Sequence, residues 1–269
     1  MKETVIRALS GLLYVALLII CIENQYTLLV LFFVFGLICL NEFCKLIQLK
    51  GFIPYLIFIF IYVVFALPYT YQAINEVIQV LTVLTIFVQL FLIKDLFSKK
   101  TIPLFGNKKY ILTTFYVSNA FVFLVLIANH HSEYNPKILL GSFILVWVND
   151  SFAYLVGKNF GRQKLFEKIS PKKTVEGFLG GLFFSCIASY FISHYTQTLN
   201  FSYWLILSII VSVFGTLGDL IESKFKRQAN VKDSGTIMPG HGGLLDRLDS
   251  IIFAGPFIYL FLRIIKYVS

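Results

Sequence analysis

Long apolar runs alternate with short polar segments along this chain of 269 residues. A run of roughly 15–20 apolar residues is long enough to cross a bilayer as a helix. We therefore predict about nine membrane-spanning helices, near residues 5–22, 26–40, 53–67, 77–93, 110–128, 138–156, 177–193, 203–221 and 250–266. The second and third runs are short for a span. The predicted fold class is an all-α, polytopic membrane protein.

The composition supports this class. Hydrophobic residues make up 58% of the chain and charged residues only 14%, which is too apolar for a soluble domain of this length. The first run is predicted to be a span and not a signal peptide, because no small-residue cleavage site follows it.

The basic residues are distributed unequally between the two sides of the predicted spans. With the N-terminus inside, 20 of the 23 lysines and arginines fall in cytoplasmic segments, in agreement with the positive-inside rule. The net charge of +9 would then attract anionic headgroups and nucleotides from the cytosol. The basic residues at 94–109 need no role beyond setting the orientation in the membrane. Such a role does not explain the glycines and carboxylates at 158–173 and 224–247.

The segment from Ser223 to Asp249 concentrates charge and glycine between two apolar runs. Its basic residues are Lys224, Lys226, Arg227, Lys232 and Arg247, its aspartates are Asp233, Asp246 and Asp249, and Gly240, Gly242 and Gly243 surround His241. Basic side chains neutralise phosphate oxygens, carboxylates hold Mg²⁺, and glycines let backbone N–H groups approach closely. The segment predicts a site for a polyphosphate and its cation at a membrane surface.

Carboxylates also lie inside or at the ends of the later runs, where each costs about 2.5–3.5 kcal/mol on insertion scales. Asp150 lies in the sixth run, Asp219 and Glu222 share a helix face in the eighth, and Asp246 and Asp249 begin the last. We expect these helix ends to meet in one cytoplasmic pocket that suits a hard cation such as Mg²⁺. The alternative for Asp150 is a structural ion pair with a neighbouring lysine.

The loop after the sixth run carries glycines, lysines and a Ser-Pro turn. We expect Ser170 to cap the next helix, with Pro171 at its first position. Lys172 and Lys173 would then occupy the two helical positions after Pro171.

Together these motifs resemble a known family. Ser223-x-Phe225-Lys226-Arg227, Lys232-Asp233-x-Gly235 and Pro239-x-His241-Gly242-Gly243-x-x-Asp246-Arg247-x-Asp249 are similar to the signature of the phosphatidate cytidylyltransferases, also called CDP-diacylglycerol synthases. Asn149-Asp150-Ser151 and Ser170-Pro171-Lys172-Lys173-Thr174-x-Glu176-Gly177 resemble its upstream elements. Met238 replaces the usual Leu, Ile or Phe, and the motifs cover about residues 145–255.

The resemblance implies an enzyme that transfers the cytidylyl group of CTP to phosphatidic acid, giving CDP-diacylglycerol and pyrophosphate in phospholipid biosynthesis. Its partners would be CTP, phosphatidic acid and membrane lipids, without nucleic acid, and a homodimer is left open. It implies a multi-pass protein of a bacterial plasma membrane with its active site facing the cytoplasm. We divide the chain into N-terminal transmembrane helices at 1–109 and a catalytic region at 110–269, with cytoplasmic loops at 157–176 and 222–249.

The resemblance also suggests roles for individual residues. The expected catalytic residues are Asp219, Asp246, Lys226, Arg227, Lys232 and His241. Substrate binding is expected from Asp150, Lys172, Lys173, Ser223, Asp233, Gly242, Gly243 and Arg247. Asp219, Asp246 and Asp249 would hold Mg²⁺, and a second cation is left open. No nucleophile with a base partner is evident, which favours direct in-line displacement.

Two other classes of protein remain open at this stage. A CTP-dependent lipid kinase would use similar loops but pass the γ-phosphate to an alcohol. A transporter would also place acids inside its spans, but the polar residues here gather at one face and not at the midplane.

Overall fold

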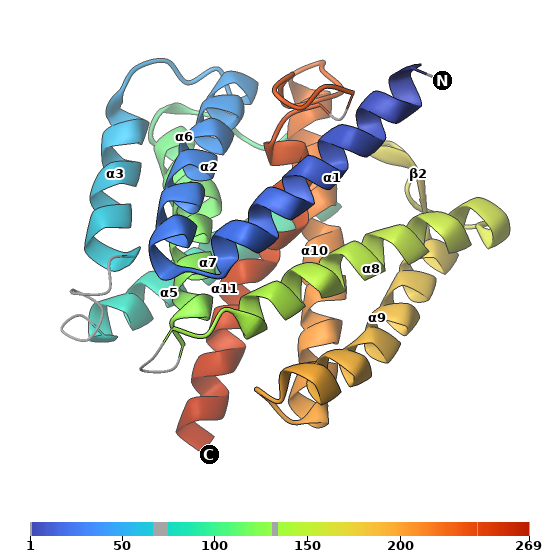
Figure 1. Cartoon of the computed structure of the whole chain (residues 1–269). Coiled ribbons are helices and arrows are strands. Elements are labelled where there is room, and N and C mark those ends of the chain that lie inside the picture. The colour runs from blue at the N-terminus through green and yellow to red at the C-terminus, as the bar shows by residue number, and fades with distance from the viewer. Residues whose placement is uncertain (1, 67–74, 131–133, 241, 269) are drawn as a thin grey trace.

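The computed structural model describes residues 2–66, 75–130, 134–240 and 242–268, which form a bundle of helices (Figure 1). The helices are α1 (Lys2–Ile22), α2 (Gln25–Leu46), α3 (Ile53–Ala66), α5 (Asn75–Phe97), α6 (Gly106–Leu112), α7 (Asn119–Ala128), α8 (Lys137–Phe160), α9 (Val175–Thr196), α10 (Phe201–Gln228) and α11 (Leu245–Val268). A π-helical segment, η1 (Thr113–Ser118), joins α6 to α7.

Over its described residues, each predicted apolar run lies in a helix, with α6, η1 and α7 forming one continuous element. Within the described ranges, seven helices are long and apolar enough to cross a membrane, and the apolar parts of α1 (Leu9–Ile22) and α3 are shorter. The second run, which is short in the sequence, lies in a helix of 22 residues. The prediction of an all-α, polytopic membrane protein is confirmed.

The segment after α8 forms a small hairpin of β1 (Lys164–Phe166) and β2 (Ser170–Thr174). The predicted cap at Ser170 is therefore wrong, because Ser170 pairs with Phe166 in extended backbone. Thr174 caps α9 instead. Its side chain accepts a hydrogen bond from the Gly177 N–H at 3.1 Å, which satisfies one donor of the first helical turn.

Glycines let the four C-terminal helices approach one another closely. A Cβ atom added to Gly181 of α9 would lie 2.6 Å from the Asn149 carbonyl oxygen of α8. One added to Gly218 of α10 would lie 2.5 Å from Cβ of Phe253 on α11. Small residues of this kind allow membrane helices to pack backbone against backbone, and here they bring the acidic segments of α8, α10 and α11 together.

The N-terminal helices share a core with this C-terminal group. Phe43 of α2 packs edge-on against Tyr116 of η1 and Phe225 of α10, with ring centroids 5.2 and 5.1 Å apart. In Figure 1 the N-terminus and the segment between α10 and α11 lie at one end of the bundle, and the C-terminus lies at the other. The polar loops of the sequence motifs therefore gather at the end that carries the N-terminus.

Candidate active site

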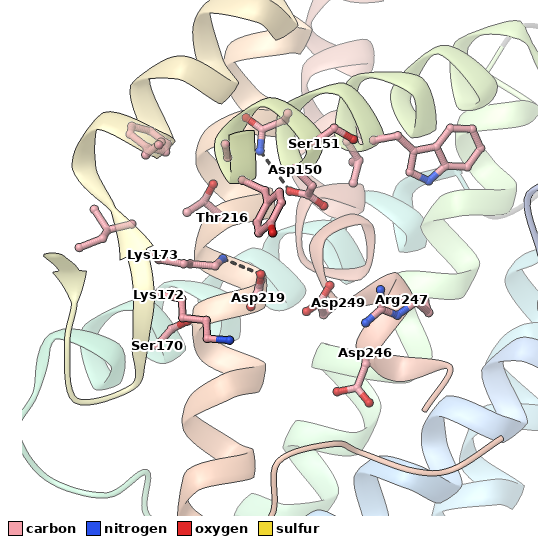
Figure 2. Close-up of a pocket in the computed structure, with 18 of the residues that line it drawn as sticks. Asp150, Ser151, Ser170, Lys172, Lys173, Thr216, Asp219, Asp246, Arg247 and Asp249 are labelled. Atoms are coloured by element: carbon pink, nitrogen blue, oxygen red, sulfur yellow. Dashed lines mark hydrogen bonds and ion pairs between the residues drawn. The ribbon is translucent and has the colours of Figure 1, made fainter. Parts of the chain in front are cut away.

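A cavity of about 810 Å³ opens where α1, α8, β2, α9, α10 and α11 meet. Figure 2 shows its charged lining residues coming from separate elements. They are Asp150, Lys172, Lys173, Asp219, Asp246, Arg247 and Asp249. Because the lining contains four carboxylates and three cationic side chains, one space can accommodate both a metal cation and anionic phosphate groups.

Asp219 forms the central ion pair of the cavity. Its Oδ2 atom lies 2.5 Å from Nζ of Lys173, which comes from the hairpin, and its Oδ1 atom accepts a hydrogen bond from the Ser223 hydroxyl at 3.2 Å. Burial alone would lower the pKa of Lys173, but the Asp219 carboxylate outweighs burial and leaves that pKa above its ordinary value. Lys173 therefore stays charged at neutral pH.

Asp150 and Asp249 also turn their carboxylates toward this space (Figure 2). Asp150 accepts a hydrogen bond from the Asn149 side chain at 3.3 Å, and Asp249 accepts one from the Ser250 N–H at 2.7 Å. Within the described part of the chain, neither carboxylate forms an ion pair. Both carboxylates therefore remain available to a cation that enters the cavity.

Asp246 has a different environment. Its Oδ1 atom pairs with Nζ of Lys226 at 2.6 Å, and its Oδ2 atom accepts hydrogen bonds from the backbone N–H groups of Ser234 and Gly243, both at 2.8 Å. Lys226 also pairs with the buried Glu222. Asp246 thus ties the loop before α11 to α10, in addition to lining the cavity.

Glu42 is a functional candidate that the sequence patterns did not reveal. Its side chain comes from α2, is only 2% exposed, and accepts hydrogen bonds from the N–H groups of Leu244 and Leu245 at 3.1 and 2.8 Å. The Ser234 hydroxyl donates a third bond at 3.1 Å. A carboxylate at this position satisfies the first donors of α11 and complements the positive end of the helix.

One signal could have identified Glu42. It is an acid two residues after the predicted run 26–40, and intramembrane carboxylates are functional by default. The helix continues to Leu46, so Glu42 lies inside an element whose end the apolar run placed too early.

The other predicted site residues lie at the edge of the cavity or outside it. Lys172 and Arg247 line it. Arg227 instead donates to the carbonyl oxygens of Ile169 and Val231, at 3.3 and 3.4 Å. Lys232 and Asp233 are exposed residues of the loop. His241 lies outside the described residues.

Gly242 closes the turn that precedes α11. Its φ of +86° suits glycine and strains other residues, and its carbonyl oxygen accepts a hydrogen bond from the Met238 N–H at 2.9 Å. The glycine-rich motif is therefore a folded turn, which presents the Gly243 N–H to Asp246.

Lys224 belongs to the same basic segment but has a structural position. Its side chain is buried, and Nζ donates to the carbonyl oxygens of Asp95 and Ser98 at 2.5 and 2.8 Å. These carbonyls lie at the C-terminal end of α5, where helices leave acceptors unpaired. Lys224 therefore caps α5.

The family model described as "Cytidylyltransferase family" matches residues 3–265 of this chain. The chain belongs to this family. The phosphatidate cytidylyltransferase of Bacillus subtilis is 34% identical over 268 residues, which cover 96% of this chain and 97% of the relative. The enzyme of the same name from Staphylococcus epidermidis is 34% identical over 265 residues, covering 96% and 98%. That from Staphylococcus aureus strain COL is 49% identical over 126 residues, covering 46% and 48%. The resemblance read from the motifs is confirmed.

In this cytidylyltransferase the carboxylates suit a divalent cation that binds together with a nucleotide. Within the described ranges, no group of three or more acidic, histidine or cysteine side chains could hold a metal ion by itself. Mg²⁺ in nucleotide-binding enzymes usually takes one or two carboxylates and completes its shell with water and substrate phosphates. Asp150 and Asp249, which lack ion pairs in the part of the chain that the structure describes, fit that pattern.

Proposed function

We propose that this membrane enzyme transfers the cytidylyl group of CTP to phosphatidic acid and releases CDP-diacylglycerol and pyrophosphate. One observation carries the proposal: carboxylates from three helices and basic side chains from the hairpin and α11 line a single cavity at the loop end of the bundle. The chain belongs to the cytidylyltransferase family, and the relatives described above are named phosphatidate cytidylyltransferases. This membership supports the chemistry for which the charge pattern is suited.

The reaction joins two anions. An oxygen of the phosphatidate headgroup attacks the α-phosphorus of CTP, the new P–O bond forms, and the bond from that phosphorus to the bridging oxygen of the β-phosphate breaks. Lys172 and Arg247, which line the cavity, would bind phosphate oxygens and reduce the repulsion between the reactants. Positioning and charge stabilisation account for most of the catalysis in such transfers, so we infer direct in-line displacement.

Asp249 and Asp150 are the residues that would hold Mg²⁺, and the ligand role of Asp219 stays a prediction because its Oδ2 atom pairs with Lys173. When bound, the ion would neutralise charge on the pyrophosphate leaving group. Lys173, which pairs with Asp219, would orient that carboxylate and contribute positive charge beside the phosphates. For Asp246 the ligand role stays a prediction, because its two oxygens bind Lys226 and the loop backbone.

We also infer that the end of the bundle carrying the cavity faces the cytoplasm. The charge asymmetry of the loops supports this orientation. In a cysteine-free background, Asn135→Cys should react with an impermeant thiol reagent added to intact cells, and Lys164→Cys should not. The reverse labelling pattern would overturn the orientation.

Pyrophosphate exchange tests the proposed reaction. Because cytidylyl transfer conserves a phosphoanhydride bond, purified protein given CDP-diacylglycerol and labelled pyrophosphate should form labelled CTP. A CTP-dependent kinase has no pyrophosphate product and would form no labelled CTP, which would contradict the proposal.

A further inference from the structure

Helix α1 forms one wall of the cavity, although the sequence motifs of the family lie elsewhere. Figure 1 shows α1 crossing the bundle in front of α10 and α11. The Ser10 hydroxyl donates to the Pro239 carbonyl oxygen at 3.1 Å, which joins α1 to the loop before α11. Gly11, Tyr14 and Val15 line the cavity. These positions share one helical face, so α1 presents a defined surface to the site.

Tyr14 is the polar side chain on that face. It is 8% exposed, and its ring stacks on Phe35 of α2 with centroids 6.2 Å apart and planes 19° apart. Among the described residues, its hydroxyl has no hydrogen-bond partner. Buried hydroxyls in folded proteins almost always have one, and Tyr14 lines the cavity, so a bound group is available as the acceptor that this phenol lacks.

The surroundings indicate the chemistry of that group. Tyr14 lines the same cavity as the cationic side chains of Arg247 and Lys172. A ligand beside Arg247 is anionic, and hydrogen bonds to anionic oxygens are stronger than neutral ones. A phosphate oxygen is therefore the acceptor that fits Tyr14.

Both proposed substrates carry phosphate. The apolar side chains on the opposite face of α1 favour the lipid as the substrate that Tyr14 contacts. Leu9, Leu12 and Leu13 on that face are 63%, 69% and 68% exposed, as expected for side chains that contact acyl chains. Resting on the function proposed above, we propose that the Tyr14 hydroxyl donates a hydrogen bond to a phosphate oxygen of the acceptor lipid. Helix α1 is then part of the lipid-headgroup site.

Replacement of Tyr14 by Phe tests this assignment, because it removes the hydroxyl and keeps the ring. In mixed micelles of defined phosphatidic acid content, Tyr14→Phe should raise the KM for phosphatidic acid about tenfold, the effect of losing one hydrogen bond to a charged group. The KM for CTP should stay within about twofold of wild type. The midpoint of thermal unfolding should not fall, since no hydrogen bond within the described chain is lost.

Two buried tyrosines provide matched controls. The Tyr62 hydroxyl donates to the Leu29 carbonyl oxygen at 2.8 Å, so Tyr62→Phe should lower the unfolding midpoint and leave both KM values unchanged. The Tyr116 hydroxyl also lacks a partner among the described residues but lies outside the cavity lining. Tyr116→Phe should therefore change neither quantity.

The possible results separate this inference from the proposed function. A wild-type KM for phosphatidic acid in Tyr14→Phe would overturn the inference, and so would an increase confined to the KM for CTP. A loss of thermal stability like that of Tyr62→Phe would indicate a structural role and would also overturn it. If wild-type protein forms no CDP-diacylglycerol but titration calorimetry shows that it binds a short-chain phosphatidate more tightly than Tyr14→Phe does, the proposed reaction fails and the Tyr14 contact stands.

Discussion

The Glu42 carboxylate on α2 accepts a hydrogen bond from the backbone N–H of Leu245, the first residue of α11, at 2.8 Å. The two residues are 203 positions apart in the chain. Asp246 and Asp249 follow Leu245 on the first turns of α11. The position of both aspartates therefore depends on a buried acid from the N-terminal helices, and the apolar first third of the chain contributes directly to the geometry of the site.

Glu42→Gln should weaken both folding and turnover. Glutamine keeps one acceptor but loses the negative charge at the start of α11 and places an amide donor near backbone donors. We expect the free energy of unfolding to fall by about 1–3 kcal/mol and turnover to fall about tenfold or more, as for other residues that orient catalytic groups. Thermal unfolding and a CTP turnover assay measure the two effects. Glu23→Gln, at an exposed position, is the control and should be silent; equal effects of both variants would remove Glu42 from this role.

Asparagine at Asp219 and at Asp246 should give different phenotypes. Asp219 faces the cavity and pairs with one lysine, so Asp219→Asn should reduce turnover on the order of 100-fold with little change in unfolding. Asp246 also holds Lys226 and two loop N–H groups, so Asp246→Asn should reduce both turnover and stability. Near wild-type turnover in both variants, across a Mg²⁺ titration, would exclude them from catalysis.

Removal of divalent cations should abolish turnover reversibly. A chelator removes the ion that Asp249 and Asp150 are proposed to hold, and added Mg²⁺ should restore the rate. Asp249→Asn should raise the Mg²⁺ concentration needed for half-maximal rate about tenfold or more, because a neutral amide is a poorer ligand for a hard cation. Full activity in excess chelator would contradict the proposed cation.

Lys224 and Lys172 should separate structure from substrate binding. Lys224→Met leaves the carbonyls at the end of α5 without their donor, which should cost about 1–3 kcal/mol of stability and leave the KM for CTP unchanged. Lys172→Met removes an exposed cation from the cavity lining. It should raise the KM for CTP or phosphatidic acid without affecting unfolding. A higher KM in Lys224→Met together with lower stability in Lys172→Met would contradict these two assignments.

The sequence predicted the helices well because apolar length and charge asymmetry are local properties. Every predicted run lies in a helix over its described residues. Four of the expected carboxylates, Asp150, Asp219, Asp246 and Asp249, line one cavity, whereas Glu222 is buried beside Lys226 outside its lining. The hairpin was missed because Ser170 and Pro171 also suit the start of a helix, and only pairing with Phe166 makes the segment extended.

The roles of the remaining residues depend on contacts between distant segments. Lys224 and Lys226 lie two positions apart in one basic motif, yet the first caps α5 and the second pairs with Glu222 and Asp246. Glu42 and Tyr14 carry no motif. Their positions become informative only when α1 and α2 are packed against the loop before α11.

Positional labelling of CTP tests the central claim most directly. Purified protein is incubated with phosphatidic acid and CTP labelled at either the α- or the γ-phosphate, and the chloroform-soluble product is counted. Cytidylyl transfer places the α-label in the lipid and releases the γ-label as pyrophosphate. Label from the γ-phosphate in the lipid, with the α-label remaining in CDP, would identify a kinase and contradict this account.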